Sequence, residues 1–233
     1  MSGPRRKRQF SQSGDAIIAV APEVEVSRYR GFTRVNHWIT ATALILLLLS
    51  GLALFHPALY FMTGLFGGGQ TTRWIHPWIG IVLVLSFLIL FAQLWRLNLL
   101  RREDIVWARN IRDVVTDNEE RLPELGKYNL GQKFVFWAMF ALILVLIATG
   151  IMIWQQYFGT LVSIPTRRLA MLIHSIAAVA IILVFILHVF AAFWTRGTIR
   201  AMTRGTVTGG WAWKHHRKWL REMARRQSRD PAD

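Results

Sequence analysis

The sequence predicts an all-α integral membrane protein in which a bundle of four helices crosses the bilayer. The 233-residue chain is 53% hydrophobic and only 18% charged, so its apolar residues must be concentrated in particular segments. Four long stretches carry no acidic or basic side chain: Val35–Gly64, Trp74–Trp95, Phe134–Thr166 and Leu169–Thr195. Each is long enough to span a bilayer, which takes about 20 mostly apolar residues.

The pattern inside these stretches favours helices over barrel strands. The runs Leu44–Leu49, Ile79–Leu90 and Leu142–Ile147 are continuously apolar and lack the alternation of a barrel strand. We therefore expect a transmembrane domain over residues 28–195. Its helices are expected at about residues 35–56, 74–95, 134–157 and 169–195.

Basic segments flank this domain at both ends. Residues 1–27 are expected to be a flexible basic extension, and residues 196–233 a cytoplasmic basic amphipathic tail. The cluster Arg5–Arg8 resembles the start of a twin-arginine signal. However, the apolar run that follows it, Ala16–Ala21, is too short for the core of such a signal.

The positions of the charges predict the orientation. Of the 28 Lys and Arg residues, only Arg73, Arg167 and Arg168 fall in the two loops on one side of the predicted bundle. The positive-inside rule places the other side, with both termini, in the cytoplasm. The net charge of +15 then reflects topology and contact with anionic lipid headgroups, not nucleic-acid binding.

The absence of cysteine limits the chemistry available to the chain. Without Cys there is no disulfide, no thiolate metal site, no iron–sulfur cluster and no covalently attached c-type haem. Any metal must use other ligands, and the seven histidines are the obvious supply.

Four of these histidines lie near the ends of predicted spans. His37 and His188 are on the inner side, whereas His76 and His174 are on the outer side. His174 and His188 are 14 residues apart on one helix, so they share a face at depths that differ by roughly 21 Å. Two histidines on facing helices at matched depth can hold a b-type haem axially. The alternative is that each is an interfacial histidine with local hydrogen bonds.

A small residue follows each of the four histidines by four positions. Because positions i and i+4 share a helix face, a small side chain there lets a flat macrocycle lie against the backbone. These residues are Ala41, Gly80, Ala178 and Ala192. We expect His56 to be an interfacial histidine, and His215 and His216 to belong to a solvated or headgroup-facing segment.

Several local motifs resemble the gamma subunit of respiratory formate dehydrogenase, within the wider di-haem cytochrome b superfamily that includes nickel–iron hydrogenase subunits. The resemblance covers about residues 28–223. It is carried by RVNHW (34–38), RWIHP (73–77), GKYNLGQK (126–133), LIH (172–174), AAFW (191–194) and WKHHRKW (213–219).

The resemblance implies a four-helix cytochrome b with two b haems. The ligands would be His37 and His188 for the inner haem, and His76 and His174 for the outer haem. It also implies a quinone, menaquinone or ubiquinone, beside the inner haem. The quinone-binding residues implied are Tyr128, Asn129, Gly131, Gln132 and His188. The alternative for this segment is a loop with Gly and Asn as turn and cap residues.

The function expected from the resemblance is electron transfer in the inner (cytoplasmic) membrane of a bacterium. An iron–sulfur beta subunit, reduced by a molybdenum- or tungsten-containing alpha subunit that oxidises formate, would deliver electrons at the outer face. Arg73, Arg167 and Arg168 would bind haem propionates or acids of the iron–sulfur subunit, or would be ordinary interfacial arginines. A higher oligomer of the complex is also compatible with the resemblance.

Three other functions are alternatives to this one. A cytochrome b subunit of a nickel–iron hydrogenase or related reductase would use the same two haems. A histidine-dependent metal-ion transporter without haem would need polar groups along a path, yet the span centres offer little beyond Ser50, Ser86 and Thr149. A structural anchor would leave the depth-matched histidines unexplained.

Overall fold

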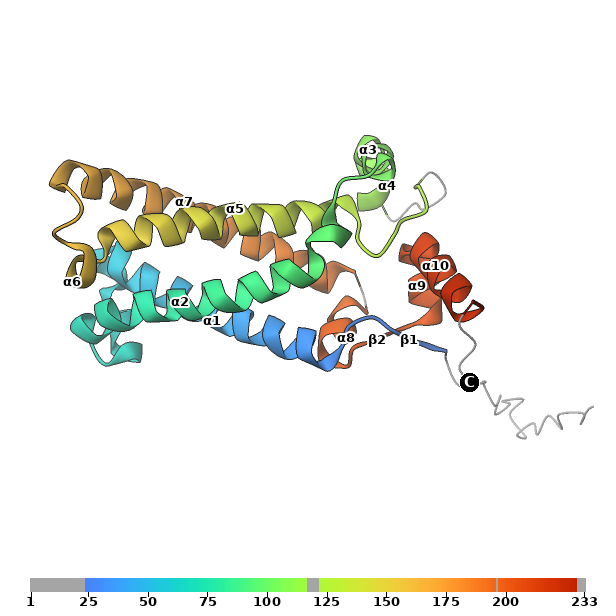
Figure 1. Cartoon of the computed structure of the whole chain (residues 1–233), viewed down its shortest axis with the longest axis horizontal. Helices are drawn as coiled ribbons and strands as arrows, with labels where there is room; N and C mark the ends of the chain where they lie inside the picture. Colours follow the sequence, from blue (N-terminus) through green and yellow to red (C-terminus); the bar gives the residue numbers. More distant parts are fainter. Residues whose placement is uncertain (1–23, 117–121, 196, 230–233) are drawn as a thin grey trace, which may run out of the picture.

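A computed structural model of the chain contains a bundle of four long helices, α1 (Gly31–Phe55), α2 (Gly69–Leu94), α5 (Leu130–Ile153) and α7 (Ile164–Trp194). It describes residues 24–116, 122–195 and 197–229. The helices form two hairpins, α1 with α2 and α5 with α7, which lie side by side (Figure 1). Each of the four is long and apolar enough to cross a membrane. The prediction of a mostly helical protein with four helices able to span a membrane is therefore confirmed.

Each long helix begins four or five residues before its predicted start. The predicted starts followed the loss of charged side chains, but Arg34, Arg73, Lys133 and Arg167 all lie within the first turns of their helices. Three of these side chains have partners within the protein, so they need not end a helix: Arg34 bonds to the Thr203 carbonyl, Lys133 to Asp104 and Arg167 to the Gly159 carbonyl. At the other end, α5 stops at Ile153 because Trp154 leaves the helical conformation.

The end of the bundle that the charge pattern predicts to face outward, called the outer end below, is made of short connections. A 3₁₀ segment, η1 (Pro57–Phe66), joins α1 to α2, and a short helix, α6 (Gln155–Phe158), precedes α7. Gly67 follows η1 with a φ of +82°, a conformation that favours glycine. The short connections leave the outer end compact (Figure 1).

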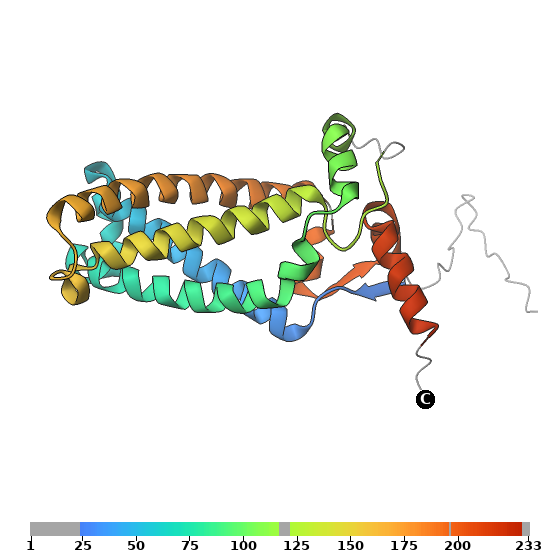
Figure 2. The same cartoon turned by 45° about the horizontal axis from the view of Figure 1, so that its top comes forward.

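The opposite end, called the inner end below, carries a folded cap, defined here as the elements outside the bundle on that side. Figure 2 shows these elements gathered beyond the inner ends of the long helices. They are β1 (Glu25–Ser27), η2 (Trp95–Asn98), α3 (Arg102–Arg109), α4 (Ile111–Val115), α8 (Thr198–Thr203), β2 (Thr206–Thr208), α9 (Gly209–His215) and α10 (Arg217–Gln227).

Two segments from opposite ends of the chain pair within the cap. β1 and β2 are antiparallel, with Val26 opposite Val207. Residues 25–27 are therefore part of a strand and not of a flexible extension as predicted, because the backbone of β2 supplies their hydrogen-bond partners. Residues 1–23 of the predicted extension lie outside the described residues.

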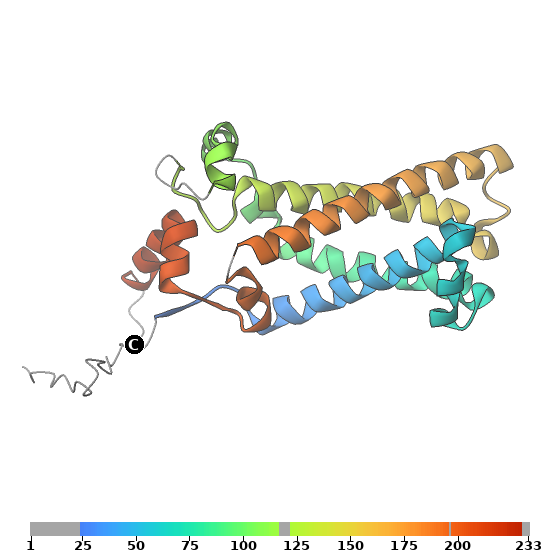
Figure 3. The ribbon, with the colours of Figure 1, turned by 180° about the vertical axis from the view of Figure 1, so that it is seen from behind.

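The C-terminal tail folds onto the protein. Trp219, on α10, packs in a buried cluster with Val26, Val207 and Ala212. α8 lies against the start of α1, as seen from behind (Figure 3), and the Arg34 guanidinium donates a hydrogen bond of 2.6 Å to the Thr203 carbonyl. The apolar face of the tail is thus covered by its own chain.

The core of the bundle lies between the two hairpins. Seven buried side chains from the four long helices form it: Ala43, Leu44, Leu83, Phe87, Met139, Ile143 and Ile181. Van der Waals packing of these side chains holds the hairpins together, because lipid provides no hydrophobic driving force between membrane helices. Many other apolar side chains on the four helices are exposed, as expected where lipid or a cofactor covers them.

Candidate functional site

Two histidine pairs face each other across the bundle. The outer pair joins His76 of α2 to His174 of α7, with ring centres 6.5 Å apart. The inner pair joins His37 of α1 to His188 of α7, with ring centres 6.3 Å apart. The structure therefore brings the four predicted residues together in the predicted pairs.

The spacing within each pair suits a single metal ion between the rings. A metal–imidazole bond of about 2.0–2.1 Å plus about 1.1 Å from nitrogen to ring centre, taken on both sides, gives about 6.3 Å. In the part of the chain that the structure describes, no group of three or more His, Cys, Asp or Glu side chains could hold a metal ion. Two axial imidazoles without further protein ligands match a haem, whose porphyrin supplies the other four bonds.

Open space lies next to the outer pair. A Cβ atom added to Gly80, one turn after His76, would meet nothing within 4 Å. Ala178 follows His174 at the same interval and is only partly covered. These positions leave room for a flat ring system on the histidine-bearing faces of α2 and α7.

Neighbouring helices hold the outer rings in place. Ser50 Oγ lies 2.7 Å from His76 Nδ1, and Thr149 Oγ1 lies 2.8 Å from His174 Nδ1. A glycine follows each hydroxyl residue. Added Cβ atoms at Gly51 and Gly150 would lie 3.4 and 3.5 Å from the Cε1 atoms of these histidines. Each ring is thus packed against the partner helix of its own hairpin.

The sequence contains a signal for this arrangement that is absent from the predictions above. A hydroxyl residue followed by glycine occurs in the outer half of both the first and the third span, at Ser50–Gly51 and Thr149–Gly150. From the sequence, Ser50 and Thr149 are predicted only to be isolated polar groups near the span centres. Which helix they face could not be read from helical periodicity alone.

The inner pair has different surroundings. His37 Nδ1 is buried and has no hydrogen-bond partner among the described residues. The Trp38 ring lies edge-on to His37, with ring centres 5.6 Å apart. Nearby, Asn36 Nδ2 donates a hydrogen bond of 2.8 Å to the Ser86 carbonyl and so joins α1 to α2.

The predicted quinone-binding segment forms the start of α5. Asn129 Oδ1 accepts a hydrogen bond of 2.9 Å from the Gln132 amide, and Gln132 Oε1 accepts one of 3.1 Å from the Asn129 amide. This reciprocal cap uses both side-chain oxygens, as in the alternative interpretation of the segment. A Cβ on Gly131 would contact the Trp107 ring at 3.6 Å.

Tyr128 of the same segment lines a cavity of about 210 Å³ at the inner end. The cavity is also lined by Lys127, Lys133 and Trp219. Burial raises the pKa of the Tyr128 hydroxyl well above its usual value, so this group stays protonated. The segment lies at the same end of the bundle as the C-terminal end of α7, which carries His188 (Figure 1).

A buried arginine at the centre of the cap was not anticipated. Arg28 is only 5% exposed and donates hydrogen bonds to the Lys127 carbonyl at 2.5 Å and to His216 Nε2 at 3.3 Å. The rings of Trp211 and Trp219 lie 5.0 Å from its guanidinium carbon, within the range of cation–π attraction. These contacts join the start of the chain to the tail.

His216 contradicts its predicted placement in a solvated or headgroup-facing segment. Its side chain is almost fully buried, and Nδ1 donates a hydrogen bond of 2.6 Å to the Gly126 carbonyl. Burial, assisted by the Arg28 charge, lowers its pKa to about 3. Burial also lowers the pKa of Lys127 to about 8, again with a contribution from Arg28. The tail is therefore a structural part of the cap.

The three outer arginines differ in their contacts. Arg167 donates hydrogen bonds to the carbonyls of Gly159 at 2.7 Å and Val162 at 3.2 Å, so it closes the loop before α7. Arg73 and Arg168 are exposed. These two remain available for a cofactor carboxylate or a partner protein.

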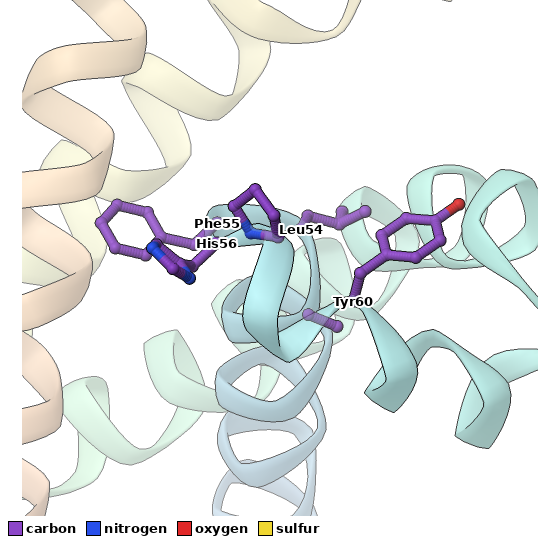
Figure 4. Close-up of a pocket in the computed structure, with 6 residues that line it drawn as sticks. Leu54, Phe55, His56 and Tyr60 are labelled. Carbon is purple, nitrogen blue, oxygen red and sulfur yellow. The ribbon is translucent and has the colours of Figure 1, made fainter.

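A larger cavity, of about 460 Å³, lies at the outer end where α1 meets η1. Figure 4 shows that Phe55 and His56 lie on one side of it whereas Tyr60 points away on the other. His56 Nδ1 accepts a hydrogen bond of 3.2 Å from the Ala58 amide. No converging set of polar groups is present among these residues, so the histidine pairs remain the candidate site.

Comparisons with known proteins agree with this geometry. The chain is 44% identical to the cytochrome b556(fdo) subunit of formate dehydrogenase from Escherichia coli (strain K12) over 198 residues, which cover 85% of this chain and 93% of that protein. It is 37% identical to the formate dehydrogenase cytochrome b556 subunit of Haemophilus influenzae, over 88% of this chain and 86% of that protein.

A third relative is the cytochrome b556(Fdn) subunit of the nitrate-inducible formate dehydrogenase of Escherichia coli (strain K12). It is 34% identical over 89% of this chain and 96% of its own length. Residues 28–205 match the family described as prokaryotic cytochrome b561. The chain therefore belongs to the prokaryotic cytochrome b561 family and is a multi-pass membrane cytochrome that binds haem b.

Proposed function

We propose that this chain is the membrane cytochrome b subunit of a respiratory formate dehydrogenase, and that it connects an outer electron donor to a quinone near the cytoplasmic side. The observation that carries the proposal is the presence of two facing histidine pairs, one at each end of the same bundle. The names of the curated relatives support formate dehydrogenase as the enzyme complex. Formate oxidation itself belongs to another subunit.

The axial ligands of the outer haem are His76 and His174, and those of the inner haem are His37 and His188. When bound, the two haems supply the one-electron chemistry that links the faces of the membrane. The chain's own residues fix the imidazoles at a separation that fits one metal ion and exclude water between the helices. Side chains from all four long helices form the apolar core between the two hairpins.

The partner at the outer end is an iron–sulfur beta subunit, which a molybdenum- or tungsten-containing alpha subunit reduces. The short connections η1 and α6 leave the outer end accessible to such a partner. Exposed Arg73 and Arg168 provide positive charge for its acidic side chains or for haem propionates. Both termini and the cap then lie in the cytoplasm, and the membrane is the bacterial inner membrane.

The quinone, menaquinone or ubiquinone, binds near Tyr128, Asn129, Gly131, Gln132 and His188. The oxygens of Asn129 and Gln132 serve the helix cap, so the groups left for a quinone carbonyl are their side-chain NH₂ donors. Reduction of a quinone to a quinol consumes two electrons and two protons. The adjoining cavity, lined by Lys127 and Lys133, is the expected entry for protons from the cytoplasm.

An optical test separates this proposal from a function without haem. The purified chain should give a reduced-minus-oxidised spectrum of a b-type cytochrome, with about two haems per chain in a pyridine haemochrome assay. A well-folded, colourless protein would refute the proposal. Purification together with formate dehydrogenase subunits, and formate-dependent quinone reduction by the complex, would distinguish it from a hydrogenase subunit.

A further inference from the structure

The two outer histidines share an arrangement that the inner pair lacks. Each outer ring lies within hydrogen-bond distance of a hydroxyl on the partner helix of its hairpin, Ser50 for His76 and Thr149 for His174. No hydrogen bond to a ring nitrogen of His37 or His188 is present in the described residues, and His37 Nδ1 is buried without a partner.

The direction of these hydrogen bonds follows from a third group. Ser50 Oγ lies 2.7 Å from the Leu46 carbonyl, and Thr149 Oγ1 lies 2.7 Å from the Val145 carbonyl. A carbonyl can only accept, so both contacts are satisfied when the hydroxyl proton goes to the carbonyl and the hydroxyl oxygen accepts from the histidine, which is the tautomer that leaves Nε2 free for a metal. Nδ1 of each outer ring therefore carries its proton. Nε2 is left as the free metal-binding nitrogen.

The contact is built into both hairpins. In each case a glycine directly after the hydroxyl residue leaves space for the histidine ring, because a larger side chain at Gly51 or Gly150 would meet Cε1. Serine and threonine in membrane helices often bond only to the carbonyl four residues earlier, and such a bond alone would be unremarkable. Here the same hydroxyl also accepts from a half-buried imidazole.

We propose that Ser50 and Thr149 are positioning residues that lower the redox potential of the outer haem relative to the inner haem. This inference rests on the proposed haem sites. A hydrogen bond from Nδ1 makes the imidazole a stronger electron donor, which stabilises the ferric state of a bound iron. An outer haem of lower potential favours electron flow from the outer face to the inner face.

The test is a potentiometric titration of the purified, haem-loaded protein with Ser50→Ala, Thr149→Val and the double variant. Each single change should raise the ferrous-to-ferric ratio of the outer haem at a fixed potential by about tenfold, a positive shift of about 59 mV, and leave the inner haem unchanged. Ser86→Ala is the matched control. Ser86 is also buried and bonds to a carbonyl of its own helix, but it contacts no histidine.

Two further variants keep the test decisive. Ser50→Thr retains the hydroxyl and should leave both potentials unchanged. If Ser50→Ala does not retain the outer haem, Ser50→Cys keeps the volume and a weaker acceptor, and it should give a smaller positive shift. Unchanged outer potentials, or equal shifts of both haems, would overturn the inference. A protein without haem in every variant, wild type included, would instead refute the proposed function.

Discussion

The imidazole rings of His37 and His188 lie 6.3 Å apart, centre to centre, although one belongs to the first long helix and the other to the last. This contact closes the inner end of the gap between the two hairpins. The outer pair closes the other end in the same way with α2 in place of α1. α7 contributes a different histidine to each pair, so the two sites can be separated by mutation.

The first prediction concerns haem content. His188→Ala should lose the inner haem and retain the outer one, so a pyridine haemochrome assay should fall from about two haems per chain to about one. Quinone reduction should be lost with it. His56→Ala is the control, because His56 lies outside both pairs. Loss of both haems from a folded His188→Ala protein would contradict the pairing.

The second prediction concerns a buried ion pair between the cap and the bundle. Lys133 Nζ on α5 lies 2.6 Å from Asp104 Oδ2 on α3, and both side chains are 3% exposed. Asp104→Asn keeps the shape but leaves the lysine charge unpaired. It should lower the free energy of unfolding by about 3–5 kcal/mol. Thermal unfolding in detergent measures the loss.

A double variant controls for the volume of the side chains at this ion pair. Asp104→Leu combined with Lys133→Met removes both charges, and it should recover much of the lost stability because no buried charge remains. An Asp104→Asn protein as stable as wild type would show that water or lipid already screens this pair.

The third prediction concerns the turn between α8 and β2. Gly205 has a φ of +85°, and an added Cβ would lie 2.8 Å from the Tyr29 carbonyl oxygen. Gly205→Ala should destabilise the cap by about 2 kcal/mol, because both the left-handed backbone and the contact are unfavourable. Limited proteolysis of the tail should become faster. Gly210→Ala is the matched control, since its Cβ would meet nothing within 4 Å, and it should cleave at the wild-type rate.

The fourth prediction concerns pH. Burial lowers the pKa of His216 from 6.5 to about 3, so the unfolded chain binds more protons than the folded cap between these values. The cap should therefore lose stability as the pH falls from about 6.5 towards 3, by an amount on the order of 4 kcal/mol in total. A protonated ring would place a second cation against Arg28.

Tryptophan fluorescence can follow this transition, because Trp211 and Trp219 adjoin the His216 ring. His216→Asn has an amide donor and does not titrate, so it should flatten the pH dependence over this range. An unchanged acid transition in this variant would assign it to the carboxylates of the cap.

The bundle and its histidine pairs could be predicted because the relevant signals are local. A span shows itself as a long apolar run, and the 14-residue interval between His174 and His188 fixes a shared helix face. Depth then follows from which loop adjoins each histidine. The hydrogen bonds of Ser50 and Thr149 to the outer histidines could not be predicted, because they depend on which helices are neighbours.

The cap was largely missed for a related reason. Arg28 and His216 are polar residues in strongly basic segments, and composition alone suggested solvent-exposed flanks. Their burial depends on each other and on Trp219, which come from distant parts of the chain. A hydrophobicity profile cannot detect burial that exists only after both ends have met.

The pairing of β1 with β2 sets an order of events during biosynthesis. β1 precedes the first membrane helix and β2 follows the last, so the ribosome releases β1 long before its partner exists. The cap can close only after all four helices have been inserted with the correct number of crossings. An odd number of crossings would leave the two strands in different compartments. Closure of the cap therefore requires a chain whose last helix has been made and whose number of crossings is even.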